Sequence, residues 1–116
     1  MVIFLTGENG FLGREIKKRL IKNYTLLKKK KKDRYIVNLK NSKKLVEFLK
    51  KNKPDLIINT AVIAKFDNKS SSEMMKVNYH AVKKIVNYCH KNKKKLIQIS
   101  GTIVHPKLKK YNIRSK

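Results

Sequence analysis

Short apolar runs along the chain alternate with longer segments in which apolar residues recur every three or four positions. The short runs occupy residues 2–5, 25–27, 35–37, 56–58 and 96–100. Their length and largely apolar composition are typical of strands buried in a parallel sheet. The longer segments run over 11–22, from Ser42 toward Pro54, and from Ser72 past Cys89. This alternation of strand and helix predicts an α/β fold with right-handed crossovers.

Each predicted helix has one apolar stripe that we expect to face the sheet. Ser42 and Ser72 stand before the second and third helices and are the expected N-caps. The expected buried positions are Phe11, Leu12, Ile16, Leu20 and Ile21 in the first helix, Leu45, Val46, Phe48 and Leu49 in the second, and Val77, Ala81, Val82, Ile85, Val86 and Cys89 in the third.

A glycine-spaced turn, Thr6-Gly7-Glu8-Asn9-Gly10-Phe11-Leu12-Gly13, connects the first strand to the first helix. Gly7 lets the chain turn sharply, Gly10 removes a side chain where backbone would approach a pyrophosphate, and Gly13 lets the helix lie close to the strand. The N–H groups at the helix start favour phosphate. The arrangement predicts nucleotide binding on a Rossmann-type doubly wound parallel sheet of about five strands, in the order 3-2-1-4-5. An ordinary steric turn is the alternative.

The composition is that of a single basic globular domain. The 116 residues have a formal net charge of +24, and among the 31 basic residues only Arg14, Arg19, Arg34 and Arg114 are arginine. Lysine, asparagine and isoleucine are the residues that AT-rich coding favours, so much of this charge is expected on solvated faces. Nucleic-acid readers use arginine and aromatic residues, and neither is concentrated here. Non-specific, salt-sensitive binding to polyanions is nevertheless expected.

The sequence gives no sign of an exported or membrane-bound protein. The single cysteine, Cys89, excludes a disulfide framework and favours a reducing compartment. No apolar run approaches the roughly twenty residues of a membrane span, and the N-terminal run is too short for a signal peptide. We therefore expect a cytoplasmic location and no membrane partner. The histidines lack the clustered spacing of zinc ligands, so no metal site is expected.

Three ordered blocks resemble the extended short-chain dehydrogenase/reductase superfamily. They are the glycine turn, the segment Pro54-Asp55 to Asn59-Thr60-Ala61, and the pair Val77-Asn78 together with Ile99-Ser100. The spacing between blocks is most similar to dTDP-4-dehydrorhamnose reductase-like proteins and related NAD-dependent epimerase/dehydratases. The resemblance covers residues 1–105 and implies an NAD(P)-binding Rossmann domain there, followed by a basic tail, 106–116, that does not complete the fold. Enzymes of this family act on nucleotide-linked keto-sugars.

The resemblance also implies which residues contact the cofactor. Lys29 or Lys30 stands where the second strand ends, near the adenine ribose, and a cation there favours the 2′-phosphate of NADP over NAD; a solvated lysine tract is the alternative. Asn38 and Leu39 stand where the family contacts the adenine. The complete set of implied contacts is Gly7, Asn9, Gly10, Phe11, Leu12, Gly13, Lys29, Lys30, Asn38, Leu39, Thr60, Ala61, Val62, Asn78 and Ser100.

The catalytic positions of the family are poorly matched. Gly101 stands where the family has the Ser or Thr that polarises the substrate carbonyl, which leaves Ser100 and Thr102 as the candidates. The catalytic pair Tyr-x-x-x-Lys is absent after this point, because Tyr111 is followed four residues later by Ser115. Whether the chain alone is an enzyme is therefore uncertain.

Three functions fit these observations. The first is the cofactor-binding portion of a truncated or split sugar-nucleotide reductase, epimerase or dehydratase, which handles a nucleotide-sugar only if a C-terminal half is supplied. The second is a non-catalytic Rossmann binding or regulatory subunit, in a homo- or hetero-oligomer. The third is a basic nucleic-acid-associated protein.

Overall fold

The computed structural model of the protein describes residues 1–21, 24–27, 37–61 and 71–99, and contains one parallel sheet. Its strands are β1 (Val2–Thr6), β2 (Thr25–Leu26), β3 (Leu56–Asn59) and β4 (Lys95–Gln98), in the order β2-β1-β3-β4. All three pairings are parallel, and the register places Thr6 opposite Asn59 and Asn59 opposite Gln98. The predicted parallel α/β architecture is thus confirmed.

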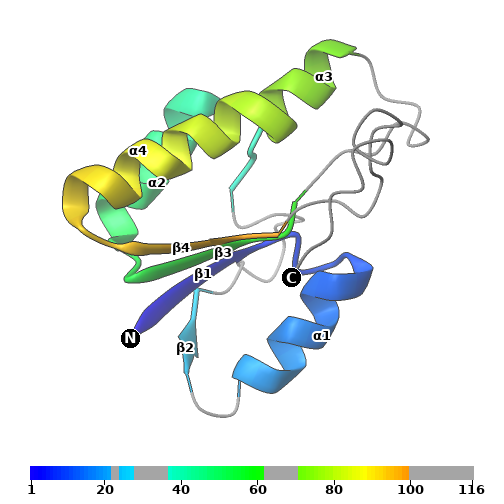
Figure 1. The fold of residues 1–116 in the computed structure, drawn as a ribbon, viewed down its shortest axis with the longest axis vertical. Coiled ribbons are helices and arrows are strands. Elements are labelled where there is room, and N and C mark those ends of the chain that lie inside the picture. Colours follow the sequence, from blue (N-terminus) through cyan, green and yellow to red (C-terminus); the bar gives the residue numbers. More distant parts are fainter. Residues whose placement is uncertain (22–23, 28–36, 62–70, 100–116) are drawn as a thin grey trace, which may run out of the picture.

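Helices cover both faces of the sheet, as expected of a doubly wound fold. The helix α1 (Phe11–Leu20) lies on one face, and α2 (Ser42–Asn52) and α4 (Val82–Asn92) lie side by side on the other (Figure 1). Before α4 the same helix includes α3 (Ser71–Met75) and a π-helical segment, η2 (Lys76–Ala81). The predicted long third helix is therefore present, with a locally widened turn around Val77-Asn78 that its apolar periodicity does not reveal.

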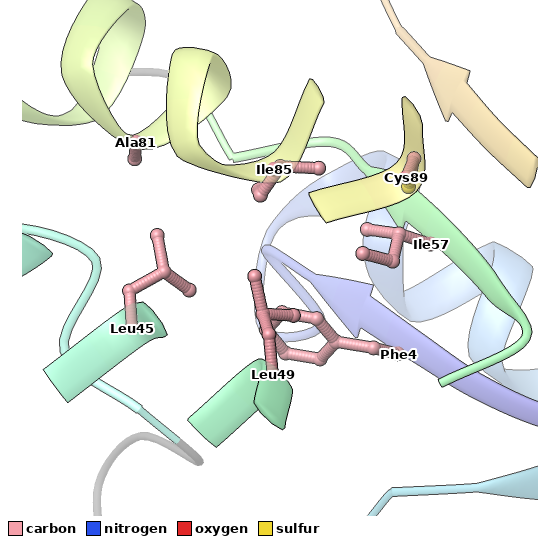
Figure 2. Close-up of a cluster of buried hydrophobic side chains, with 7 residues drawn as sticks. All are labelled: Phe4, Leu45, Leu49, Ile57, Ala81, Ile85 and Cys89. Atoms are coloured by element: carbon pink, nitrogen blue, oxygen red, sulfur yellow. The ribbon is translucent and has the colours of Figure 1, made fainter. Parts of the chain in front are cut away.

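The larger core lies between the sheet and the pair α2 and α4. Phe4 and Ile57 point from the sheet toward the helical side chains that face them (Figure 2). The Phe4 ring also contacts the ring of Phe48, with 4.8 Å between the centroids. The buried members of this core are Phe4, Leu45, Leu49, Ile57, Ala81, Ile85 and Cys89. Most of the predicted stripes of α2 and α4 are therefore confirmed, but Val86 is exposed because it lies about 100° around the helix from the buried Ile85.

A smaller core lies under α1. Ile3, Leu5 and Ile58 are buried there, and Ile16 and Leu20 pack against them. The predicted stripe is wrong at its two ends, because Phe11, Leu12 and Ile21 are exposed. The helix approaches the sheet through Gly13, which is its buried residue, and Phe11 and Leu12 lie at the helix start, where the sheet ends.

Neither predicted N-cap lies at the N-cap position of its helix. Asn41, not Ser42, caps α2, and its side-chain oxygen accepts a hydrogen bond of 3.1 Å from the Lys44 N–H. Ser72 lies inside α3, which begins at Ser71. Several neighbouring polar residues here can act as an N-cap. Which one does so depends on where the helix begins once it packs against the sheet.

The remaining fold predictions concern the edges of the sheet. The fourth strand is confirmed at 56–59, and the fifth is found at 95–98 rather than 96–100. Val37 lies in a bend, and the other two residues of the predicted strand 35–37 lie outside the described residues, so the five-strand order stays a prediction. Across the described part of the chain, no helix is long and apolar enough to cross a membrane.

Candidate functional site

The candidate site is formed where β1 and β3 end side by side. The chain leaves β1 at Thr6, turns through Gly7 to Gly10, and enters α1 at Phe11. The Gly10 N–H donates to the Gly7 carbonyl at 3.0 Å, which closes the turn. The exit of β3, Thr60-Ala61, lies beside this turn, because the register pairs Thr6 with Asn59. The structure therefore brings together the first two sequence blocks, which are more than fifty residues apart.

The Thr6 hydroxyl holds the two strand exits together. It donates a hydrogen bond to the side-chain oxygen of Asn59 and accepts bonds of 3.1 Å from the N–H groups of Thr60 and Ala61. The Asn59 amide in turn donates to the side-chain oxygen of Gln98 on β4 at 2.9 Å. Thr6 and Asn59 are 4% and 1% exposed, so the hydrogen bond between their side chains is shielded from water and its loss would be costly.

Thr60 adds a second connection between β3 and the turn. Its hydroxyl lies 2.7 Å from the Thr6 carbonyl, to which it donates, and 3.4 Å from the Gly7 carbonyl. The Thr60 side chain thus acts as a brace under the turn. The backbone of the turn is therefore fixed by the Thr60 side chain on the side that faces β3, and the turn leads directly into α1.

Two of the glycines are required by packing. Gly7 has φ +68°, and a Cβ atom on it would lie 2.4 Å from the Thr60 hydroxyl. A Cβ atom on Gly13 would lie 1.8 Å from the Gly7 carbonyl oxygen. The sequence-based roles of these two residues, a sharp turn and a close helix–strand approach, are confirmed.

Gly10 differs from the other two because its environment is open. It has an extended backbone, φ −78° and ψ 171°, and a Cβ atom there would meet a single neighbour, the Gly7 carbonyl oxygen at 3.3 Å. The backbone conformation does not require glycine at this position, and a Cβ atom there would require the Gly7 carbonyl to move by only a few tenths of an ångström. The absence of a side chain at Gly10 leaves space directly in front of the helix.

The start of α1 is suited to an anion. Gly10 is its N-cap, no side chain caps it, and its first turn has no acidic residue. The first N–H groups of the helix therefore point outward together with the positive end of the helix dipole. Phe11 and Leu12 are 83% and 44% exposed beside this end. The nearby carboxylate of Glu8 is turned toward Lys17, 3.6 Å away, so it does not occupy the anion position.

The other predicted contacts are placed as follows. Asn9 is exposed within the glycine turn. The side-chain oxygen of Asn38 accepts a hydrogen bond of 3.0 Å from the Lys40 N–H, and Leu39 packs against the larger core. Asn78 is exposed on η2. The predicted residues Lys29, Lys30, Val62, Ser100 and Thr102 lie outside the described residues.

Sequence reasoning missed the importance of Thr6, Asn59 and Gln98 as a hydrogen-bonded set. A signal was available, because Thr6 and Asn59 are each the first polar residue after an apolar strand. The pairing itself could not be read from that pattern, because it depends on the register of the two strands. No group of three or more potential metal ligands occurs in the described ranges.

Fold and site together define a class of protein. A parallel sheet with helices on both faces, and a glycine turn leading into an uncapped helix at the carboxyl end of the central strand, are the features of a Rossmann-type α/β domain. The model of the family described as RmlD substrate binding domain matches residues 1–114. The chain belongs to this family, which confirms the resemblance seen in the sequence.

Solved structures with the same fold support this assignment. The chain is similar to a hypothetical dTDP-4-dehydrorhamnose reductase from Sulfolobus tokodaii, with 26% identity and a TM-score of 0.73, over 86% of this chain and 39% of that one. A dTDP-4-dehydrorhamnose reductase from Clostridium acetobutylicum gives 28% identity and a TM-score of 0.70, over 91% and 40%. A dTDP-4-dehydrorhamnose reductase from Bacillus anthracis in complex with NADP gives 21% identity and a TM-score of 0.66, over 82% of this chain and 34% of that one. The chain thus spans two-fifths or less of the length of each of these proteins. A search of curated proteins found no match.

Proposed function

We propose that this chain is the NAD(P)-binding portion of a sugar-nucleotide reductase, epimerase or dehydratase. The observation that carries the proposal is the open space at Gly10 in front of the uncapped start of α1. A dinucleotide diphosphate needs both features, because it must approach the backbone closely and is stabilised by free N–H groups. Family membership and the NADP in the Bacillus anthracis relative support the same conclusion.

Each part of the dinucleotide has residues suited to it. The N–H groups at the start of α1 would hold the diphosphate, and the exposed side chains of Phe11 and Leu12 would cover it. Asn38 and Leu39 would face the adenine, and Lys29 or Lys30 would favour the 2′-phosphate of NADP. Thr60, Ala61, Val62, Asn78 and Ser100 would border the nicotinamide half. We propose NADP as the preferred cofactor and NAD as the weaker one.

The chain would supply binding and orientation, but not the whole chemistry. When bound, the nicotinamide ring exchanges hydride with a sugar carbon. The Thr6 and Asn59 network would keep the exit of β3 in place beside that ring. No Tyr-x-x-x-Lys pair follows Ser100 and Thr102, so proton transfer to the sugar oxygen requires residues from another polypeptide segment. Without that segment we expect binding of the cofactor and little turnover.

The proposal includes the finer architecture. Residues 1–105 would form the complete cofactor domain with strand order 3-2-1-4-5, where the third strand includes residues 35–37, and 106–116 would lead toward the remainder of the fold. The alternative, a non-catalytic Rossmann subunit in an oligomer, is favoured by one observation, Gly101 at the position where the family has the Ser or Thr that polarises the substrate carbonyl. It predicts the same cofactor site, and differs in that adding a complementary C-terminal half would restore no activity.

Calorimetry with NADPH and NADH at low salt tests the cofactor site. We expect saturable 1:1 binding, with NADPH tighter than NADH. Because a chain of charge +24 attracts any polyanion, tripolyphosphate is the control ligand and should not compete at equal concentration. Failure of NADPH to bind at millimolar concentration would refute the proposal.

A further inference from the structure

Seven lysines are concentrated at the end of the strands opposite the glycine turn. They lie on the last turns of α2 and α4, on their caps and at the start of β4, which all lie together at one end of the molecule (Figure 1). We call this surface the basic edge. Its lysines are Lys50, Lys51, Lys53, Lys91, Lys93, Lys94 and Lys95.

The basic edge is held as one rigid unit. The Tyr88 hydroxyl on α4 donates to the Pro54 carbonyl after α2 at 2.9 Å, and the Lys95 N–H donates to the Asp55 carbonyl at 3.2 Å. Both helices end in a left-handed lysine, Lys53 with φ 47° and Lys93 with φ 55°. These caps turn the chain at equivalent places, so the two lysine segments lie next to each other and not on separate mobile loops.

Little negative charge opposes these lysines. Asp55 is the acidic residue within the edge, and its carboxylate accepts hydrogen bonds from the Val2 N–H at 2.8 Å and the Lys94 ammonium at 3.0 Å. Glu47 lies about one turn earlier on α2, so seven positive charges face at most two negative ones. Within the described ranges Lys94 is the only one of the seven lysines with an ion pair, and the other six are exposed.

Helix stabilisation explains only part of this surface. Lysines in the last turn of a helix offset its dipole, which accounts for Lys50, Lys51 and Lys91. The C-caps Lys53 and Lys93 lie at the helix ends and share this role, but it does not account for Lys95 at the start of β4. Lysines this close together repel one another, and this repulsion costs free energy. An anionic partner with closely spaced charges would reduce the repulsion.

We propose that the basic edge is a sequence-independent binding surface for the phosphate backbone of duplex nucleic acid. Double-stranded DNA presents about one charge per 1.7 Å of its axis, a density that matches clustered lysines. Lysine contacts phosphate as a point charge, and none of the seven positions supplies the arginine or aromatic group that reads or stacks bases. An acidic protein partner would normally require aromatic or arginine anchors, which these positions also lack.

The salt dependence of binding follows from the charge count. If about five lysines neutralise phosphates, the logarithm of the association constant falls with that of salt with a slope of about −4.5. Affinity should then drop about 500-fold between 50 and 200 mM salt. Because the basic edge and the glycine turn lie at opposite ends of the strands, about 13 Å apart, cofactor and duplex should bind independently.

Two variants of equal net charge test whether the duplex binds at the basic edge. The first replaces Lys50, Lys53, Lys91 and Lys93 by glutamine, and the second replaces four exposed lysines elsewhere, Lys43, Lys44, Lys76 and Lys83. Both remove four of the +24 charges. Fluorescence anisotropy with two labelled duplexes of unrelated sequence should show at least about 30-fold weaker binding and a flatter salt slope for the first variant, and less than about threefold change for the second.

Other results would overturn the proposal. Equal losses in the two variants would mean that diffuse charge binds the duplex, and no loss in either would exclude the basic edge. A several-fold preference for one duplex sequence, or tighter binding of polyglutamate than of DNA, would contradict backbone recognition. Circular dichroism melting should give similar curves for both variants and the parent chain. Gly10→Val should bind the duplex as the parent chain does, which separates this surface from the cofactor site.

Discussion

The substitution Gly10→Val should weaken NADPH binding at the proposed site much more than it lowers the unfolding free energy, because the backbone conformation at Gly10 does not require glycine. The extended backbone at Gly10, φ −78°, accepts any residue, and the nearest atom to an added Cβ is the Gly7 carbonyl oxygen at 3.3 Å. That neighbour needs to move by a few tenths of an ångström. Valine is a poorer N-cap than glycine, so we expect a loss of about 1 kcal/mol in unfolding free energy.

Cofactor affinity should respond much more strongly than stability. The isopropyl group introduced by Gly10→Val would occupy the space in front of the α1 start, where the proposed diphosphate would accept hydrogen bonds from backbone N–H groups. Hydrogen bonds to a charged group contribute about 1.5–3 kcal/mol each. Loss of two such bonds corresponds to a Kd for NADPH that rises at least about 100-fold.

The matched control is Gly13→Ala, which should behave in the opposite way. Its Cβ atom would lie 1.8 Å from the Gly7 carbonyl oxygen, so α1 must move away from the strand. Overpacking against backbone should cost about 2–3 kcal/mol or more. Calorimetry with NADPH and urea unfolding followed by circular dichroism measure the two quantities. A Gly10→Val chain that binds NADPH within about threefold of the parent, or unfolds as readily as Gly13→Ala, would refute the reasoning.

Three further predictions concern stability. Thr6→Val leaves the Asn59 oxygen and two N–H groups without their partner, so urea unfolding should show a loss of about 3 kcal/mol, and a loss below about 1 kcal/mol would contradict the network. The Val2 N–H, and then Lys94, lower the pKa of Asp55. Its stabilising effect should therefore be complete above the ordinary aspartate pKa of about 3.9 and be lost as the pH falls through the lowered value. Unfolding titrations from about pH 6 to about pH 2 should show a shallower acid decline in Asp55→Asn, and equal declines would contradict the assignment. Leu49→Ala, at a side chain 1% exposed, should cost about 2–5 kcal/mol in the same urea assay, and under about 1 kcal/mol would mean that the core is looser than described.

Much of the fold could be predicted because its signals are local. The apolar runs of β1 and β3, the periodic faces of α2 and α4 and the three glycines are each visible within fewer than twenty residues. Errors occurred at element ends. The N-cap of α2 and the exposure of Phe11 depend on how a helix docks, and not on its own sequence pattern.

The candidate site was predicted less completely than the fold. The glycine turn was found because its chemistry lies in consecutive residues. How tightly each glycine is enclosed could not be predicted, because the space around each depends on distant atoms. A Cβ atom on Gly7 would collide with Thr60, whereas one on Gly10 would meet only the Gly7 carbonyl oxygen at 3.3 Å. The network of Thr6, Asn59 and Gln98 was missed because its members lie on three strands.

The sequence alone therefore determined the kinds of element, their order and the glycine turn, since these depend on hydrophobic periodicity and on backbone freedom over short distances. Tertiary structure decided which polar groups meet at the carboxyl edge of the sheet. It also decided that Gly10 has a single close neighbour, the Gly7 carbonyl oxygen, and that the lysines after α2 and α4 form one surface. These features depend on strand register and helix packing, which join residues about forty to fifty positions apart through contacts that no local pattern records.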